Sequence, residues 1–552
     1  MGQSASIIIT NAHVFTADPA NPIAEAVAIA DNRIVFVGNN TDAQDWKTSS
    51  TRMIDGQGAT LMPGFIDSHY HLLLGSVELA YLQVGDAKTL SDLHVIISQH
   101  INKNPDEFSY NATGLSYDIL TGEALTRHHL DTIVKDHPLI IMSFDGHTVW
   151  VNTRALEIAG MLNGKDIDAT GTIVMDEDGT ATGELLESAA YGHVLVHFPA
   201  WGRVAKAFGG NAFADVKIDT IREREYLREG LRMAAKFGIT SVHNMDGDME
   251  QANFYAGMDD IGDLTLRVSV PYSVKPYTTV QDLDEAVEMI RTHQSDMVHA
   301  GQAKFFMDGV IESWTGFLLD DYNDRPDWKG EALYSADHFN RMAAECDKRG
   351  LQITVHAIGD AAVRRTLDGF EYAQKQNGRR DSRHRVEHIE LIHPDDLPRF
   401  ATLGVIAAMQ PLHSPIDYPA TADVYLERIG QERWHRSFAW QYVRGAGARL
   451  AFGSDWSVVS PDPILGINAA LNRKAWAYGL PDHRQSLQDT LMSYTYDGAY
   501  AEFMEHKKGQ LKVGLLADLV LLSENLFTTP NDTIKDIHPV MTICDGRIVY
   551  EA

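Results

Sequence analysis

"LMPGFIDSHYHLLLG", residues 61–75, joins an apolar segment typical of a buried β-strand to two histidines, His69 and His71, that are one residue apart. Residues i and i+2 of a strand point to the same face, so this pattern at a strand end presents two imidazoles side by side. Paired imidazoles suit a metal ion. The alternative is one core histidine and one surface histidine, and the choice depends on what lies at equivalent positions along the chain.

Short apolar runs recur after this stretch and alternate with helical patterns. With the first, they make eight candidate strands, at residues 60–71, 238–245, 266–273, 303–309, 351–360, 384–391, 404–413 and 449–456. Near-continuous apolar strands between helices indicate a parallel sheet that is covered on both faces. Eight such units predict an α/β fold, a distorted (β/α)8 TIM barrel. A doubly wound open sheet is the alternative.

Both ends of the chain have a different pattern, of short strands separated by turns. The segments are residues 6–16 and 25–38 at one end and 516–523 and 540–551 at the other. We therefore expect a small β-sandwich built from residues 1–60 and 505–552 and a barrel over residues 61–504. The long gap after the first barrel strand, about residues 75–235, predicts an insertion that forms a lid over the barrel mouth.

The composition narrows the possible partners. The chain has 552 residues, of which 44% are hydrophobic, and a formal net charge of −29. Such an acidic surface repels phosphate backbones and anionic lipids, which argues against nucleic acid and membrane partners and leaves a small-molecule substrate. The two cysteines, Cys346 and Cys544, form no disulfide framework. We see no signal peptide and no apolar run long enough for a membrane span, so we expect a cytoplasmic protein.

Polar residues fall at the ends of several predicted strands, where a barrel brings them to one rim. They are His69, His71, Lys304, His356, His388 and Asp455. Taken singly, His356 and His388 would be hydrogen-bonded core histidines and Asp455 would cap a helix. Together, imidazole and carboxylate ligands favour zinc, with manganese or iron as alternatives. Two ions about 3.5–4 Å apart would hold a reactive hydroxide between them.

Lys304 lies within the apolar segment "AKFF" (303–306). Burial of an ammonium is costly, and nearby cations favour the neutral amine. A neutral amine can capture carbon dioxide as a carbamate, which is an anion able to bridge two metals. The alternative is a lysine that reaches solvent or pairs with Asp308 or Glu312.

Several motifs together resemble the amidohydrolase superfamily, in particular its YtcJ-like branch (amidohydrolase family 3), which includes N-substituted formamide deformylases. The motifs are "PGFIDSHYH", "KFFMDG", "VHAIGD", "VEHIEL", "MQPLH", "FGSDWSV", "FDGHTVWVNTRALE", "GTATGELLE" and the closing "VGLLADLVLLSENL" with "DGRIVYE". The resemblance covers essentially the whole chain. It implies a distorted barrel with a β-sandwich made by both termini, and metal ligation by His69, His71, His356, His388, Asp455 and a carboxylated Lys304. It also implies a homo-oligomer, a dimer or larger.

The resemblance also implies a mechanism. Asp455 would accept a proton from metal-bound water and later deliver it to a leaving amine, while His147 of the "DGH" motif, or less directly His413, would contact the substrate carbonyl. Deaminases of the superfamily have a glutamate three residues after the fifth-strand histidine, where this chain has Gly359. We therefore expect hydrolysis of an amide-type C–N bond. Cyclic amides, carbamates and ureas, deamination, and a non-catalytic scaffold remain as alternatives.

Aromatic side chains near these motifs suggest an apolar pocket, although most aromatics in any sequence are core residues. With His413, the predicted pocket residues are Phe144, Trp150, Trp314, Phe317 and Trp456. The branch often has an Arg-Thr-Ala-like stretch where this chain has "ESWTGF" (312–317). We expect an N-substituted amide with an aromatic or long apolar group, and Arg473 is a candidate for a carboxylate clamp.

Overall fold

The computed structural model describes residues 4–120, 122–167, 171–208, 220–414 and 419–552. The chain forms two compact units. The first contains Met1–His71 and Leu231–Ala552, and the second contains Leu72–Gly230.

The first unit is built on a sheet of eight parallel strands in the order β21-β20-β19-β18-β17-β16-β15-β8. Their bounds are β8 Phe65–Tyr70, β15 Ile239–Asn244, β16 Arg267–Ser273, β17 Val298–Phe306, β18 Gln352–Ala357, β19 Arg385–His388, β20 Ile406–Met409 and β21 Arg449–Phe452. Each predicted strand region contains or overlaps one of them, which confirms the eight-stranded α/β barrel, and β17 begins five residues before the predicted start at residue 303. The predicted first strand was too long, because its beginning, β7 (Thr60–Pro63), pairs in another sheet.

The barrel closes beside the two histidines of the opening motif. The Asp455 N–H donates to the His69 carbonyl at 2.7 Å, and the His71 N–H donates to the Trp456 carbonyl at 2.8 Å. Tyr70 and Trp456 form a parallel bridge at the same place. The loop after β21 therefore joins the end of β8, and we call this junction the seam. It brings the first and last predicted site segments into direct contact.

Helices follow the strands of the first unit. They are α1 Asn40–Ala43, α9 Met249–Asp260, α10 Leu283–Thr292, α11 Ala336–Lys348, α12 Asp360–Asn377, α13 Leu397–Leu403, α14 Pro419–Ile429, α15 Trp440–Gly445, α16 Pro463–Asn472, α17 Leu487–Ser493 and α18 Tyr496–Ala501. Their starts follow ordinary capping chemistry. The Ser335 side chain accepts from the His338 N–H at the start of α11, and Asp462 accepts from the Ile464 N–H at the start of α16.

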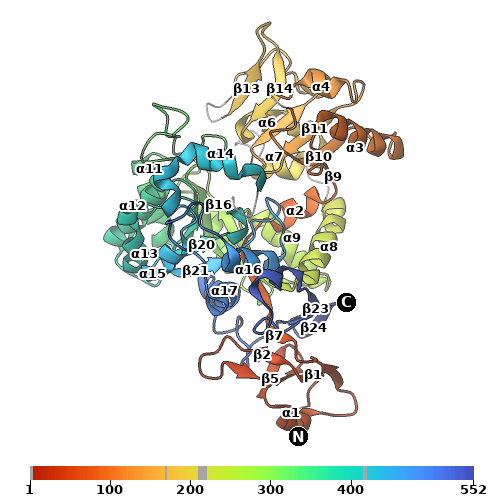
Figure 1. Cartoon of the computed structure of the whole chain (residues 1–552), viewed down its shortest axis with the longest axis vertical. Coiled ribbons are helices and arrows are strands. Elements are labelled where there is room, and N and C mark those ends of the chain that lie inside the picture. The colour runs from red at the N-terminus through yellow and green to blue at the C-terminus, as the bar shows by residue number, and fades with distance from the viewer. Residues whose placement is uncertain (1–3, 121, 168–170, 209–219, 415–418) are drawn as a thin grey trace. The chain divides into compact units, whose positions relative to one another are not determined.

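Two further sheets of the first unit contain the chain termini (Figure 1). One has the order β5-β4-β1-β6 and the other β24-β23-β22-β7-β2-β3. The bounds are β1 Ile7–Thr10, β2 His13–Phe15, β3 Ile23–Ala24, β4 Ala26–Ala30, β5 Arg33–Gly38, β6 Arg52–Asp55, β22 Leu519–Leu522, β23 Pro539–Cys544 and β24 Arg547–Glu551. N-terminal β7 pairs with C-terminal β22, so the two ends of the chain share one sheet. Their buried side chains, among them Val14, Val27 and Leu519, form one apolar cluster.

The second unit has a six-stranded sheet in the order β13-β14-β12-β11-β10-β9. Its strands are β9 Leu82–Gln83, β10 Tyr110–Leu115, β11 Leu139–Ser143, β12 Thr148–Val151, β13 Thr172–Met175 and β14 Ala181–Leu186. The helices that begin in this part of the chain are α2 Leu72–Glu78, α3 Leu90–Lys103, α4 Arg127–Asp131, α5 Thr153–Ala159, α6 Ser188–Leu195, α7 Gly202–Phe208 and α8 Thr220–Lys236. This unit has apolar clusters of its own, one of which contains Trp150.

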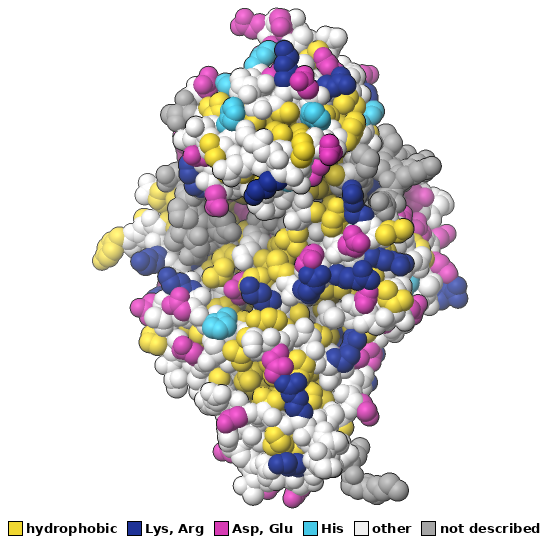
Figure 2. Space-filling model, turned by 90° about the vertical axis from the view of Figure 1, so that its right-hand side faces the viewer, with side chains coloured by type: hydrophobic (Ala, Val, Ile, Leu, Met, Phe, Trp, Pro, Cys, Tyr) yellow, Lys and Arg dark blue, Asp and Glu magenta, His cyan; other side chains and the backbone are white. Residues whose placement is uncertain are grey.

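On the face drawn in Figure 2, acidic side chains of the described residues are intermixed with Lys and Arg rather than gathered in one patch. None of the helices in the described part of the chain is both long enough and apolar enough to cross a membrane.

Candidate metal centre

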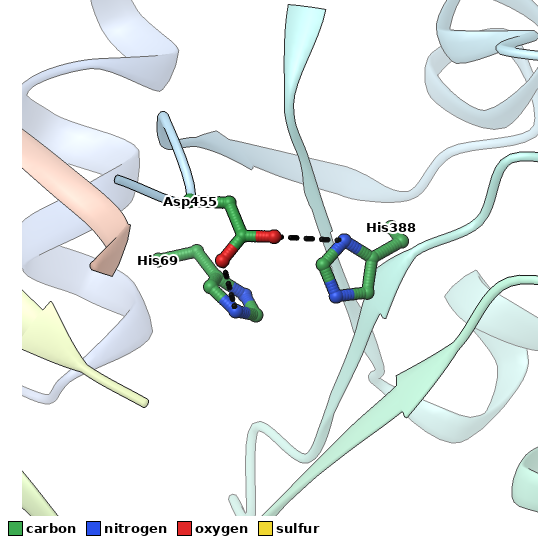
Figure 3. A group of neighbouring side chains, drawn as sticks. All are labelled: His69, His388 and Asp455. Carbon is green, nitrogen blue, oxygen red and sulfur yellow. Dashed lines mark ion pairs between the residues drawn. The ribbon is translucent and has the colours of Figure 1, made fainter. Parts of the chain in front are cut away.

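Three of the predicted ligands converge in one buried place (Figure 3). His69, His388 and Asp455 each offer one ligand-type atom, and these atoms lie within 4.8 Å of one another. Asp455 Oδ1 is 3.3 Å from His69 Nε2, and Asp455 Oδ2 is 4.0 Å from His388 Nδ1. All three residues are buried. The ends of β8 and β19 and the loop after β21 therefore deliver ligand-type groups to one small volume.

Two more histidines face the same carboxylate. His71 Nε2 is 3.2 Å from Asp455 Oδ1, and His413 Nε2 is 3.8 Å from Asp455 Oδ2. The His413 ring lies almost parallel to the His388 ring, with the two centroids 5.9 Å apart. Asp455 is thus approached by several imidazoles, although its Oδ1 is buried and has no hydrogen-bond partner among the described residues.

His356 and Lys304 come from neighbouring strands, β18 and β17. The His356 and His388 ring centroids are 4.4 Å apart. The Lys304 Nζ is buried without a hydrogen-bond partner in the described structure and lies 4.7 Å from the Phe306 ring centroid. Asp308, one of the two alternative partners, instead accepts backbone N–H groups from Ile358, Gly359 and Phe317. The amine is therefore held in the interior without a hydrogen bond, where the neutral form is favoured.

Four of the histidines have one ring nitrogen within hydrogen-bond distance of an acceptor oxygen. His69 Nδ1 is 2.7 Å from Glu387 Oε2, and His71 Nδ1 is 2.8 Å from Asp246 Oδ1. His388 Nδ1 is 2.9 Å from Gln410 Oε1, and His356 Nε2 is 3.1 Å from the Gly309 carbonyl. Because each partner oxygen accepts, each of these nitrogens carries a proton, and the opposite nitrogen of the ring is the one that can coordinate a metal ion once it is unprotonated. Ligating histidines are commonly oriented in this way.

Burial and neighbouring charges shift several pKa values at this centre. Burial lowers the pKa of Lys304 to about 8. Burial by itself would lower the pKa of His71, but Asp246 and Asp455 outweigh it and raise that pKa to about 9. Burial would raise the pKa of Asp455, yet His71, His413 and Lys304 keep it below its ordinary value. Asp455 is therefore a carboxylate at neutral pH, which suits both a ligand and a proton acceptor.

Two site residues have a left-handed backbone. The φ angle is 73° at His388 and 61° at Asp455. Such a conformation costs about 1–3 kcal/mol for a residue other than glycine and is common at functional sites. At both positions the chain leaves a barrel strand and turns its side chain toward the common volume. The contacts made by these two side chains therefore stabilise the fold by more than the unfavourable backbone conformation costs.

Sequence reasoning missed the partners of the histidines. Glu387 immediately precedes His388 in "VEHIEL", and Asp246 closes "VHNMD" after β15. Gln410 belongs to "MQPLH", one of the motifs that resemble the amidohydrolase superfamily. The sequence shows only that each partner is a charged or polar residue at a strand end. Which imidazole it contacts depends on how the strands are aligned in the folded barrel.

The predicted pocket residues of the first unit have different surroundings. Trp456 is buried, with its ring 5.0 Å from that of Tyr70. The Trp314 indole donates to Asp324, and the Arg428 guanidinium lies 3.7 Å from its ring centroid. The Phe317 ring lies against Arg365. Trp314 and Phe317 thus contact cationic side chains.

Arg473, the predicted carboxylate clamp, is buried and donates to the backbone carbonyls of Phe438 and Ser437. These two hydrogen bonds fix the guanidinium group to the backbone of this segment. A structural role accounts for this arginine better than a clamp.

His147, Phe144 and Trp150 belong to the second unit. The His147 Nδ1 is 3.0 Å from Glu187 Oε2, and its backbone N–H donates to Asp145. Trp150 is buried in an apolar cluster of its unit, and Phe144 packs edge-on against Tyr117. Each of the three has defined contacts within its own unit. The contact of His147 with a substrate carbonyl stays a prediction.

The donor set of the first unit fits a metal ion. Lys304 Nζ, His388 Nε2, His413 Nε2 and Asp455 Oδ1 are buried polar atoms that lack a hydrogen-bond partner in the described structure. Each unsatisfied buried group costs about 1–3 kcal/mol, so four in one place require an explanation. A cation coordinated by imidazole and carboxylate would satisfy His388 Nε2 and Asp455 Oδ1, and that donor chemistry suits zinc.

Comparison with known proteins agrees with this chemistry. A model of the amidohydrolase family matches residues 52–550. The chain is 28% identical to protein LONG AFTER FAR-RED 3 of Arabidopsis thaliana, over all of this chain and 92% of that protein. It is 26% identical to the putative amidohydrolase YtcJ of Bacillus subtilis, over 96% of each chain. It is 25% identical to the N-substituted formamide deformylase of Arthrobacter pascens, over 100% of this chain and 99% of that one.

Solved structures show the same fold. A metal-dependent hydrolase from Pyrococcus horikoshii aligns with a TM-score of 0.72 and 24% identity over 93% of this chain and 96% of that chain. Atrazine chlorohydrolase from Arthrobacter aurescens, solved with zinc, aligns with a TM-score of 0.55 and 15% identity over 99% of this chain and 95% of that chain. With a barrel that converges histidine and aspartate side chains and a family match over nearly its whole length, the chain belongs to the amidohydrolase family, the metal-dependent hydrolases of carbon–nitrogen bonds.

Proposed function

We propose that this protein hydrolyses the amide bond of an N-substituted amide that carries an aromatic or other apolar group. The main support for this reaction is the position of the Asp455 carboxylate. The Asp455 carboxylate lies within 3.2–3.8 Å of ring nitrogens of His69, His71 and His413, while its Oδ1 lacks a hydrogen-bond partner in the described structure. Full-length similarity to an N-substituted formamide deformylase supports the substrate class.

Six residues would hold the metal, namely His69, His71, Lys304, His356, His388 and Asp455. Zinc would supply a Lewis acid that lowers the pKa of a water molecule and polarises a carbonyl. Lys304, as its carbamate, would provide the anionic oxygen atoms that bridge two ions. Within the described residues its amine has no hydrogen-bond partner, and burial lowers its pKa to about 8. Both observations support this role, because the neutral amine is the form that reacts with carbon dioxide.

Asp455 acts as general base and then as general acid. It takes one proton from the attacking water, whose oxygen forms the new bond to the carbonyl carbon. When the C–N bond breaks, the same carboxyl group gives that proton to the leaving nitrogen, so the products are a carboxylic acid and an amine. The buried position of Asp455 excludes bulk water from this transfer. Its ionised state at neutral pH is the one required for the first step.

His413 is the nearest candidate to orient the substrate carbonyl. Its Nε2 is buried, has no hydrogen-bond partner in the described structure and is 3.8 Å from Asp455. His147 keeps the same predicted role. Replacing each by asparagine and measuring kcat and KM separately tests both assignments.

The structure argues against deamination. A side chain at position 359 would start 2.1 Å from the Phe317 carbonyl oxygen, so the position has no room for a glutamate. The next residue, Asp360, accepts hydrogen bonds from Arg436 and from the Leu319 N–H. Neither residue is placed to protonate a ring nitrogen. Carbamates and ureas remain the second candidate class, since they need the same proton transfer.

A release assay tests the proposal. The protein, loaded with zinc in the presence of bicarbonate, is incubated with N-benzylformamide, N-methylformamide, a benzyl carbamate and a benzylurea, and amine release is quantified. We expect N-benzylformamide to be the best substrate and chelator treatment to abolish its hydrolysis reversibly. Full cation occupancy without amine release from any of the four compounds would refute the proposal and favour a scaffold role.

A further inference from the structure

A second group of charged and titratable side chains is buried in the first unit, outside the predicted ligand set. Its members are His243, Arg385, Glu502 and Lys508, none of them more than 5% exposed. His243 belongs to β15 and Arg385 to β19, whereas Glu502 and Lys508 follow α18 along the chain. Buried charges are costly unless they are paired. The proposed reaction uses none of these residues, so their contacts must explain why they are buried here.

Arg385 connects this group to the candidate metal centre. It donates to the Glu387 carboxylate through Nε at 2.9 Å and through Nη2 at 3.2 Å, and Nη2 also donates to the Ser68 carbonyl. Glu387 Oε2 is in turn 2.7 Å from His69 Nδ1. Arg385 therefore holds the carboxylate that orients one of the predicted metal ligands. Such outer contacts affect metal binding because they fix the direction of the ligand ring.

The third nitrogen of Arg385 defines where His243 carries its proton. Arg385 Nη1 is 2.6 Å from His243 Nδ1. A guanidinium can only donate, so Nδ1 accepts and is unprotonated. The neutral ring then has its proton on Nε2, which lies 3.3 Å from Glu502 Oε1. Burial lowers the pKa of His243 to about 4, although Glu502 opposes this shift, so the ring is neutral at neutral pH.

Glu502 has further partners that fix its position independently of His243. Lys508 Nζ is 2.7 Å from Glu502 Oε1 and also donates to Ser241 Oγ at 2.7 Å. His299 Nε2 is 3.0 Å from Glu502 Oε2. The Glu502 carboxylate therefore stays in the barrel interior as a second buried anion, in addition to Glu387.

The His243 ring lies between the guanidinium and this second anion, because one ring nitrogen contacts Arg385 and the other faces Glu502. An apolar side chain in its place would leave a buried N–H of Arg385 without an acceptor. The Glu502 charge would then attract the guanidinium away from Glu387. The neutral ring prevents this by accepting from Arg385 and by separating the two charged groups.

We propose that His243 is a positioning residue for the metal centre. By accepting from Arg385, it keeps the guanidinium against Glu387. Glu387 in turn fixes the direction of the His69 ring, so His243 controls zinc affinity without touching the metal or the substrate. The proposal rests on the metal assignment made above but not on the identity of the substrate.

The zinc affinity of the metal-free full-length protein tests this role, and competition with a chromophoric chelator at neutral pH measures it. His243→Leu removes the acceptor, so the dissociation constant for zinc should rise by about 10–100-fold, the usual effect of losing an outer partner. His243→Asn places an amide oxygen where Nδ1 lies, so its affinity should stay within about threefold of wild type. The control, His293→Leu, removes a buried histidine that contacts Asn253 of α9, and it should bind zinc as wild type does.

Nitrogen NMR of metal-free protein with isotope-labelled histidine tests the tautomer directly. The histidine signals that disappear in His243→Asn identify this ring. They should be those of a neutral imidazole with its proton on Nε2 and none on Nδ1. This measurement needs neither zinc nor a substrate, and circular dichroism verifies that each variant folds.

The outcomes separate this proposal from the proposed function. Wild-type zinc affinity in folded His243→Leu, no recovery in His243→Asn, or an equal loss in His293→Leu would overturn the positioning role and leave the hydrolase assignment intact. A proton on Nδ1 of His243 in the wild-type protein would also overturn it, and this result decides the question if His243→Leu does not fold. Failure of the wild-type protein to bind any zinc would overturn both proposals.

Discussion

At the residue scale, the most informative position is Asp455. It is buried, faces several imidazoles and has a left-handed backbone with φ 61°. Asparagine tolerates that backbone better than most residues and has the same shape, so Asp455→Asn removes the charge and proton affinity with little change in structure. It is therefore the variant that separates chemistry from folding.

We expect Asp455→Asn to lower kcat by about 10²–10⁴-fold, the usual contribution of general acid–base catalysis. The thermal midpoint of the metal-loaded protein should change little, and at least one cation should stay bound, because the other predicted ligands remain. Steady-state kinetics and elemental analysis of the same sample check both points. Turnover within a few-fold of wild type would remove Asp455 from the proton transfer.

His71 makes cation binding depend on pH. Its pKa is raised to about 9, because Asp246 and Asp455 outweigh the effect of burial. Below that pH a cation must displace a proton from His71, so the affinity for zinc should fall about tenfold for each pH unit from 9 down to 6.5. Calorimetry in buffers of different ionisation enthalpy counts the released proton. An affinity that stays constant over this range would contradict the assignment.

The raised pKa of His71 also affects the stability of the metal-free protein, which should change with pH in the opposite direction to zinc affinity. A folded-state pKa above the ordinary 6.5 means that protonated His71 stabilises the fold fully below about pH 6.5 and that this stabilisation is lost as pH rises through about 9. The metal-free protein should therefore lose stability over the range in which zinc binds more tightly. Asp246→Asn should flatten both trends.

At the element scale, strand positions could be predicted more completely than the contacts between strands. Eight apolar runs were enough to locate β8, β15 to β21 and the residues at their ends. The division of residues 60–71 into two strands was missed, because Pro63 and Gly64 interrupt a run that is apolar on both sides. Gly64 marks a close approach, since a Cβ there would lie 2.3 Å from the Thr240 side chain. A contact between residues so far apart in the chain cannot be recognised from the hydrophobic pattern around Gly64.

The partners of the site histidines could not be predicted for the same reason. Glu387 and His69 are 318 positions apart, and their 2.7 Å contact depends on how barrel closure brings β19 near β8. A strand pattern predicts which face a residue occupies but not which residue faces it from across the barrel. The predicted ligands could be recognised in the sequence because histidine, lysine and aspartate are costly to bury in apolar strands. Their hydrogen-bond partners look like ordinary polar residues at strand ends.

The seam between β8 and β21 requires glycine at position 453. A Cβ there would lie 2.5 Å from the His69 backbone nitrogen and 2.7 Å from Asp67 Oδ1. Asp67 in turn accepts the N–H groups of His69 and Ser454, and burial raises its pKa to about 7. One added methyl group would thus push apart the strand ends that carry His69 and Asp455.

We expect Gly453→Ala to lower the free energy of unfolding by about 1–3 kcal/mol and to weaken zinc binding at least tenfold. The control is Gly445→Ala, at an exposed helix end where a Cβ meets nothing within 4 Å. That substitution should leave the free energy of unfolding unchanged or raise it slightly. Urea unfolding and zinc titration of both variants provide the comparison, and equal behaviour of the two variants would show that the seam does not control the site.

At the scale of the whole molecule, an ion cluster links the barrel to the sheet that contains both termini. Arg267 of β16 is completely buried and donates to both Asp518 oxygens, at 2.7 and 2.9 Å. It also donates to Asp545 at 2.9 Å. Asp518 and Asp545 lie next to β22 and β23, so one guanidinium connects a central barrel strand to the C-terminal strands. The first unit is thereby expected to unfold cooperatively.

Removal of this guanidinium should destabilise the first unit as a whole. Arg267→Met leaves two buried or half-buried carboxylates without their cation, and breaking a buried pair in this way costs about 3–5 kcal/mol. The control, Arg291→Met, removes an exposed arginine that pairs with Glu288 within α10, a change expected to cost less than about 1 kcal/mol. Urea unfolding should be followed by tryptophan fluorescence for the barrel and by zinc release for the site. If the terminal sheet were independent of the barrel, Arg267→Met would leave zinc release at its wild-type urea concentration. A shared shift of both signals to lower urea is the expected result, because the seam and the ligands depend on an intact barrel.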